Sequence, residues 1–199
     1  MEDTDIMKKI GIIGDFLKTA GIISNVLSKN SYTSKIINYK HFFINPKNNF
    51  DFLIIGISSP YTSSDYINKL KLDILIINDS FQITNLTTPN LKLNNPSIIL
   101  LNSDKAKEIE LKNSTPSYLI TFGFNPKSTI TVSSIETCIH NTMQISIQRT
   151  LPTLYSTEIL EQDFSINIYD TNIDAILSAI STILVATDID IENLKNIII

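Results

Sequence analysis

The stretch KKIGIIGDFLKTAGIISNVL, residues 8–27, contains the transition on which the fold prediction depends. Its first part, Lys8 to Gly14, is a short Ile-rich run, which is typical of a strand buried on both faces of a parallel sheet. From Lys18 to Leu27 the apolar residues recur instead at helical spacing. The stretch therefore predicts a strand that leads into a helix, which is the basic unit of an α/β fold.

The chain up to Gly123 repeats this alternation. Short helices are predicted at residues 63–70 and 104–111. Further apolar strands are predicted at residues 34–39, 51–57, 73–77, 97–101 and 118–122. Because apolar strands alternate with amphipathic helices, we predict an α/β fold, a mostly parallel sheet with helices on both faces.

After Gly123 the pattern becomes that of half-exposed antiparallel strands. Apolar and polar side chains alternate within residues 128–135, 139–148 and 164–168, which predicts a small antiparallel sheet added to the parallel core. The chain then returns to helical spacing, with helices predicted at residues 172–186 and from Asp190.

We predict one domain over residues 1–199. It would consist of a parallel α/β core (8–123), antiparallel strands (124–170) and C-terminal helices (171–199). The connections 45–49 and 87–96 are rich in Asn and Pro, which indicates loops.

Composition excludes several classes of protein. The chain has 199 residues, of which 43% are hydrophobic, and a formal charge of -4, a balance that favours a globular fold over disorder. Cys138 is the only cysteine, so an intrachain disulfide and a Cys-rich zinc site are excluded. The mild acidity argues against nucleic acid as a partner. We expect a cytoplasmic protein that does not enter a membrane, because neither a signal peptide nor a long apolar run is present.

The strongest site signal is the segment Gly11 to Thr19, because it joins a predicted strand to a predicted helix. A P-loop in this context holds phosphates on backbone N–H groups, with a Lys reaching the phosphates and a Thr binding Mg²⁺. In this spacing Lys18 and Thr19 would take those roles, but Leu17 stands where a P-loop has Gly. The alternative is an ordinary strand-to-helix turn with a surface Lys.

Over residues 9–199 the chain resembles the central, ATP-binding domain of the Mur ligases. The sequence GIIGDFLKTA, residues 11–20, aligns without a gap to that family's G-x-x-G-T-N-G-K-T-T pattern. Four positions match the pattern: Gly11, Gly14, Lys18 and Thr19. Four positions depart from it: Asp15, Phe16, Leu17 and Ala20.

Four further stretches carry the resemblance in the family's order. Ser58 and Ser59 match the end of a Glu-x-Ser-Ser motif, but Gly56 replaces its Glu. The remaining stretches are the strand end at Asn78, the stretch SIILLNSD (97–104) with LITFG (119–123), and the helix start at Asn172, where Ala175 replaces a second Asn. The family's metal-binding His has no counterpart in Ser80 to Ile83.

The resemblance implies ATP and Mg²⁺ as cofactors, amide-bond formation as the reaction, and peptidoglycan precursors as substrates. By the same resemblance, the nucleotide would contact Gly14, Asp15, Lys18, Thr19 and Asn172, and Mg²⁺ would contact Thr19 and Ser58. The family's N-terminal and C-terminal domains have no counterpart in these residues. Because the metal-binding Glu and His are both missing, we expect no ligase activity from this chain alone.

Three interpretations remain open at this stage. The chain is a catalytically degenerate Mur-ligase-like domain that acts as a binding or regulatory subunit, a nucleotide-binding component completed by a partner, or an unrelated α/β domain. The apolar C-terminus, Ile197 to Ile199, favours a protein partner or a homo-oligomer. Weaker candidate residues are His41, His140 and Cys138, for which surface or inert roles are favoured, and Asp188, Asp190 and Glu192, which indicate helix capping.

Overall fold

The structure, a computed structural model, describes residues 7–38, 50–58, 63–79, 90–93, 96–105, 110–113, 117–137, 141–169 and 171–195. His41, Ser59, Cys138, His140 and the C-terminal Ile197 to Ile199 lie outside the described residues. The helices are α1 (Phe16–Lys29), α2 (Ser64–Leu70), α3 (Ile173–Ala186) and α4 (Ile191–Lys195).

The main sheet has nine strands in the order β2-β3-β1-β4-β6-β8-β9-β10-β13. Its strands are β1 (Lys8–Ile13), β2 (Ser34–Asn38), β3 (Phe52–Ile57), β4 (Ile74–Ile77), β6 (Ile98–Asn102), β8 (Tyr118–Gly123), β9 (Ile130–Thr137), β10 (Asn141–Ile147) and β13 (Gln162–Asn167). Two small two-stranded sheets pair β5 (Asn90–Leu93) with β7 (Glu110–Asn113), and β11 (Leu151–Pro152) with β12 (Glu158–Ile159).

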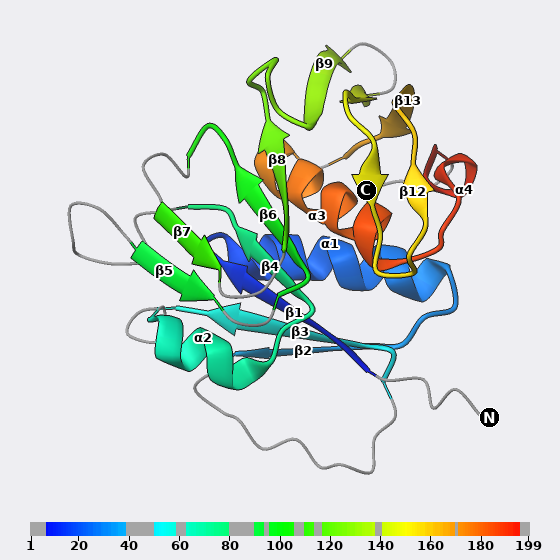
Figure 1. Cartoon of the computed structure of the whole chain (residues 1–199). Helices are drawn as coiled ribbons and strands as arrows, with labels where there is room; N and C mark the ends of the chain where they lie inside the picture. The colour runs from blue at the N-terminus through cyan, green and yellow to red at the C-terminus, as the bar shows by residue number, and fades with distance from the viewer. Residues whose placement is uncertain are drawn as a thin grey trace.

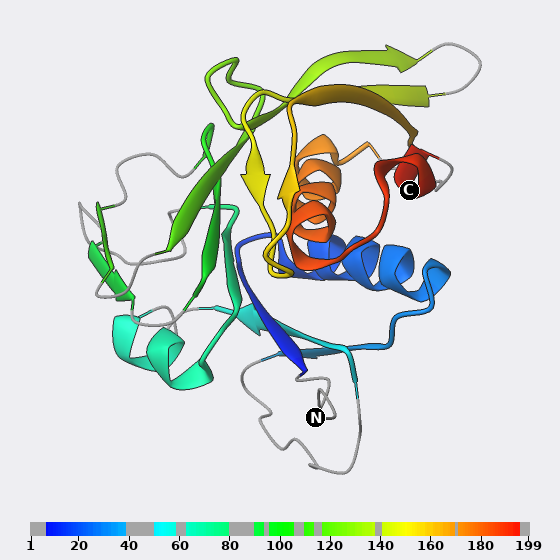
Figure 2. The same ribbon diagram turned by 45° about the vertical axis from the view of Figure 1, so that its right-hand side comes forward.

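The strands from β2 to β9 pair in parallel, and β9, β10 and β13 pair antiparallel. The predicted mostly parallel α/β fold is therefore confirmed. The predicted antiparallel addition to the parallel core is also confirmed, and β9 joins it to β8 through the pairs Phe122–Ile130 and Gly123–Thr131. The antiparallel strands therefore continue the main sheet and curve over α3 (Figure 2).

Two apolar cores lie on opposite faces of the sheet, because alternate residues of each strand point to opposite sides. In β1, Ile10 and Ile12 pack in the core that contains α1 and α3, whereas Ile13 packs in the core that contains α2. Figure 1 shows α1 and α3 side by side on one face and α2 on the other. Every residue of α3 from Ala175 to Ala186 is buried, as expected for a helix enclosed by sheet and helix.

The helix predicted at 104–111 is wrong over the residues that the structure describes. Ser103 to Lys105 form a turn, and Glu110–Asn113 is strand β7. The turn is held by Asn102, whose Oδ1 accepts hydrogen bonds from the backbone N–H groups of Asp104 (2.9 Å) and Lys105 (3.1 Å). Such Asn side-chain bonds compete with helix formation, which explains the difference.

A second set of contacts joins the ends of α1 and α3 away from the P-loop-like segment. The Tyr32 hydroxyl, after α1, donates a hydrogen bond to Asp188, after α3. Burial raises the pKa of Tyr32 above its ordinary value, and the hydrogen bond to Asp188 and nearby Tyr155 raise it further. The Tyr32 ring also meets Phe52 edge-on, with 5.4 Å between ring centroids. These contacts tie both helices to the start of β3.

Candidate functional site

The carboxyl ends of the central strands meet at one edge of the sheet. Ile13 of β1 pairs with Ile57 of β3 and with Ile77 of β4, so the residues that follow them lie side by side. Open parallel sheets bind ligands at this edge. The sequence hypothesis that the P-loop-like segment, Ser58 and Asn78 gather there agrees with this register.

Asn78 organises the buried part of this edge. Its Nδ2 donates to the carbonyl of Gly14 (3.0 Å) and to Oγ1 of Thr19 (3.2 Å), and its Oδ1 accepts from the hydroxyl of Ser178 in α3 (2.8 Å). Asn78 is 6% exposed, and both hydroxyl residues are fully buried. The Thr19 side chain, which resembles a Mg²⁺ ligand in sequence, is thus engaged within the protein.

The connection between β1 and α1 is only two residues long, Gly14 and Asp15. Both have positive φ, +78° and 39°. A Cβ at position 14 would lie 2.9 Å from the Cβ of Asp79, so Gly is required there. The helix has already begun at Phe16, so positions 16 and 17 do not form the open loop of backbone N–H groups that surrounds a phosphate.

Phe16 also fills the space next to strand β3. A Cβ at Gly56 would come within 2.5 Å of the Phe16 ring. Gly56 is the position where the resembling motif has a metal-binding Glu, so a longer side chain there would meet the ring. Phe16 and Gly56, which both depart from the Mur ligase motifs, are therefore in contact in the structure.

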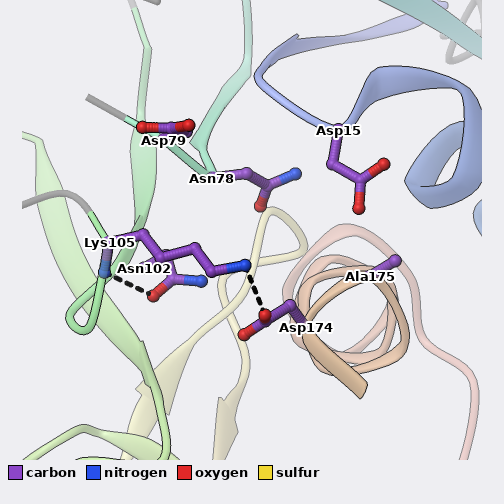
Figure 3. Close-up of a pocket in the computed structure, with 7 residues that line it drawn as sticks. All are labelled: Asp15, Asn78, Asp79, Asn102, Lys105, Asp174 and Ala175. Carbon is purple, nitrogen blue, oxygen red and sulfur yellow. Dashed lines mark hydrogen bonds and ion pairs between the residues drawn. The ribbon is translucent and has the colours of Figure 1, made fainter. Parts of the chain in front are cut away.

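A pocket of about 70 Å³ opens at this edge (Figure 3). Its lining comes from the β1–α1 turn, the ends of β4 and β6, and the first turn of α3, namely Asp15, Asn78, Asp79, Asn102, Lys105, Asp174 and Ala175. Pockets for drug-sized ligands and cofactors are typically about 300–1,000 Å³. This pocket therefore has room for a small molecule but not for a whole nucleotide.

The pocket is acidic. Three of its side chains are carboxylic acids and one is an amine, Lys105. The ammonium of Lys105 lies 2.5 Å from Oδ2 of Asp174. That hydrogen bond raises the pKa of Lys105, and the charges of Asp174, Asp15 and Asp79 raise it further. An anion at this place would meet the same carboxylates.

Asn172 links the two helix N-termini at the site. Its Oδ1 caps α3 by accepting from the N–H of Ala175 (3.1 Å), and its Nδ2 donates to Oδ2 of Asp15 (2.8 Å). Asp15 precedes α1 and Asp174 lies in the first turn of α3, where helix dipoles favour negative charge. The protein's own carboxylates thus stand where a phosphate would be bound.

The residues at this edge do not fit ATP with Mg²⁺. The phosphate loop is replaced by helix, the Thr19 hydroxyl is bound to Asn78, and the Phe16 ring lies over Gly56. Across the described residues, no group of three or more His, Cys, Asp or Glu side chains is placed to hold a metal ion. Lys18 is exposed in the first turn of α1, and Ser58 lies beyond β3, outside the pocket lining.

Comparison with solved structures identifies the fold. A UDP-N-acetylmuramoyl-L-alanyl-D-glutamate–2,6-diaminopimelate ligase matches with a TM-score of 0.64 and 11% identity, over 96% of this chain and 45% of that one. The fold is that of the Mur ligases. MurF from Acinetobacter baumannii matches with a TM-score of 0.58 and 10% identity, over 96% and 45% of the two chains. MurF from Thermotoga maritima in complex with ADP matches with a TM-score of 0.55 and 11% identity, over 96% of this chain and 48% of that one.

The Mur-ligase-like fold expected from the motifs is therefore confirmed. The chain spans about half the length of the structures that it matches. No protein-family model and no curated sequence matches it. Among the helices that the structure describes, none is both long and apolar enough to cross a membrane.

The structure brings together four of the residues singled out in the sequence: Gly14, Asp15, Thr19 and Asn172. Sequence reasoning missed four pocket residues: Asp79, Asn102, Lys105 and Asp174. The first two lie within two residues of the end of a predicted strand, so the rule that ligands bind at carboxyl ends of parallel strands could have found them. Lys105 was not recognised because it was assigned to the helix predicted at 104–111, whereas it lies in a turn after β6.

Proposed function

We propose that this chain is a Mur-ligase-like domain that is catalytically degenerate and acts as a binding or regulatory subunit. The observation that carries the proposal is the early start of α1 at Phe16, which removes the open phosphate loop. The ring of Phe16 against Gly56 supports it further, because a metal-binding carboxylate has no room there.

The negative charge at this edge of the sheet supports the same function. Such chemistry depends on positioning phosphates and neutralising their charge. At this edge the side chains of Asp15, Asp79 and Asp174 add negative charge, and the single lining cation, Lys105, is bound to Asp174. The residues hold one another in a network rather than presenting donors to a polyphosphate.

The proposal places the protein in the cytoplasm, beside peptidoglycan precursor synthesis, because the similar structures are ligases of that kind by name. It works through a protein partner or a second copy of itself, for which the apolar residues Ile197 to Ile199 are the proposed contact. Nucleic acid is not proposed as a partner, since the chain is acidic.

Calorimetric titration of the purified protein with ATP, with and without Mg²⁺, tests the proposal. We expect no binding at millimolar ATP. Micromolar binding that depends on Mg²⁺ would contradict it. A native mass spectrum of the same sample would show whether the chain associates with itself.

A second candidate function is a nucleotide-binding component that a partner completes. Its support is the exposed Lys18 in the first turn of α1, three residues after Asp15. If titration detects ATP binding, Lys18→Ala separates the candidates. Loss of affinity in Lys18→Ala would favour the second function, and unchanged affinity would exclude the P-loop-like mode.

A further inference from the structure

The pocket of Figure 3 presents both acceptors and a donor to its interior. The carboxylate of Asp15 is exposed, and its Oδ2 accepts a hydrogen bond from a neutral amide, Asn172. Asp79 and Asp174 add two further carboxylates to the lining, against the one ammonium of Lys105. The lining side chains therefore favour a positively charged occupant.

Asn102 supplies the observation that points to a ligand. Its Oδ1 is held by the N–H groups of Asp104 and Lys105, which fixes the orientation of the amide. Its Nδ2 consequently points into the pocket (Figure 3). Only 1% of Asn102 is exposed, and within the described part of the chain Nδ2 has no hydrogen-bond partner. Among the described residues, the fully buried side-chain atoms without a partner are Oγ1 of Thr131 and Oγ of Ser181, so Nδ2 of Asn102 is open to the pocket. An occupant with an acceptor can receive its hydrogen bond there.

The two requirements together narrow the chemistry of the occupant. A bare cation satisfies the carboxylates but offers nothing to the donor of Asn102. An anion satisfies Asn102 but is repelled by Asp15 and its neighbours. A volume of about 70 Å³ limits the occupant to a few heavy atoms.

We propose that this pocket binds a small primary ammonium compound that also carries a hydrogen-bond acceptor, of the class of the amino alcohols. The ammonium lies among the carboxylates, and the acceptor receives the Nδ2 hydrogen bond of Asn102. This inference rests on the proposed function and deepens it. It assigns a non-nucleotide ligand to the edge of the sheet where the Mur ligase motifs have a phosphate loop.

The test compares 2-aminoethanol with ethylamine, which are both cations at pH 7 and differ by one hydroxyl. Each is titrated into the ¹⁵N-labelled full chain at constant ionic strength, and amide shifts are followed by NMR. We expect saturable millimolar binding of 2-aminoethanol, with the side-chain NH₂ signals of Asn102 shifting. The affinity for ethylamine should be lower by a factor of about five or more, because ethylamine leaves the Nδ2 donor of Asn102 without an acceptor.

Two variants separate the two halves of the pocket. Asn102→Asp keeps the oxygen that holds the Asp104 turn but removes the donor, so the preference for 2-aminoethanol over ethylamine should disappear. Asp15→Asn keeps the shape and suits the positive φ of that position, and both amines should bind about three-fold more weakly. The matched control is Asp163→Asn on the edge strand β13, which should change neither affinity.

Three outcomes would overturn the inference: no saturable shift with either amine, equal affinity for both in the unaltered protein, or saturable binding of inorganic phosphate in the pocket. The Asn102 signals of the unaltered protein decide the question even if Asn102→Asp does not fold. The ATP titration is independent of this one. Failure of both amines together with failure of ATP to bind leaves the proposed function standing, whereas ATP binding removes it whatever the amines do.

Discussion

The ring of Phe16 lies against the backbone of Gly56, so closely that a Cβ added at position 56 would be 2.5 Å from ring atom Cδ1. Phe16 is the first residue of α1, and Gly56 is the last residue but one of β3, where it pairs with Ile12 of β1. In sequence these are two separate departures from the Mur ligase motifs. In the structure they are coupled, because the ring of Phe16 fits only if position 56 has no side chain.

This contact predicts a coupling between the two positions. Gly56→Ala alone should lower the free energy of unfolding by about 1–3 kcal/mol, because the new methyl group displaces the ring. In a Phe16→Ala background the same change should cost much less, since the obstructing ring is gone. Urea unfolding of the two single variants and the double variant measures this coupling.

Gly21 offers a matched control for that cycle. It lies in α1, and a Cβ there would meet nothing within 4 Å. Gly21→Ala should therefore stabilise the protein by about 0.5–1 kcal/mol through helix propensity alone. Equal effects of Gly56→Ala with and without Phe16 would contradict the coupling.

The Asn78 network predicts a larger loss of stability. Asn78→Ala removes the partner of Thr19, Ser178 and the Gly14 carbonyl at once. Because buried polar groups are left unsatisfied, the free energy of unfolding should fall by about 2–3 kcal/mol. Chemical unfolding followed by circular dichroism measures the change. Asn167→Ala, at an exposed position of β13, should stay within about 0.5 kcal/mol of the unaltered protein.

The sequence predicted most strands of the sheet because buried parallel strands have a distinctive apolar run. The four Ile and Leu residues of β4 show this, since every one is buried. Short strands such as β7 escaped notice, because four residues of mixed polarity carry no clear period. The turn at Asn102 was also missed, since its side-chain bonds to Asp104 and Lys105 depend on the end of β6.

The candidate site was only partly predictable. The motif alignment placed Asp15 and Asn172 near each other, and they are hydrogen bonded. It could not reveal that α1 starts at Phe16, because the ring packing against Gly56 that favours this start joins residues 40 positions apart. The acidic character of the pocket also depends on side chains from four separate elements, which only the fold brings together.

Tyr32 predicts a dependence of stability on pH. Its pKa is raised in the folded protein by burial and then by the hydrogen bond to Asp188, so the folded state holds the phenol proton more tightly. Its stabilising contribution is complete below about pH 10, where the unfolded chain is also protonated, and is lost as the pH rises through the folded pKa. The melting temperature should therefore fall more steeply above about pH 10 than in Tyr32→Phe.

Thermal unfolding of both proteins at a series of alkaline pH values measures this difference. Tyr169→Phe is the control, because Tyr169 is 73% exposed and should follow the unaltered protein. Identical curves for the unaltered protein and Tyr32→Phe would contradict the raised pKa of Tyr32 in the folded protein.

The last prediction concerns whether nucleotide binding was lost locally. If Phe16, Leu17 and the missing carboxylate at Gly56 together prevent nucleotide binding, replacing these residues by those of the Mur ligase motifs should restore it. We expect the variant Phe16→Asn, Leu17→Gly, Gly56→Glu to gain Mg²⁺-dependent ATP binding that the unaltered chain lacks. The gain requires all three changes, because Leu17→Gly alone leaves the Phe16 ring against β3. Calorimetry of the triple variant, with Leu17→Gly as control and circular dichroism to verify folding, decides the matter. A folded triple variant without ATP binding would mean that the acidic pocket around Asp15 and Asp174, and not the turn, is what excludes the nucleotide.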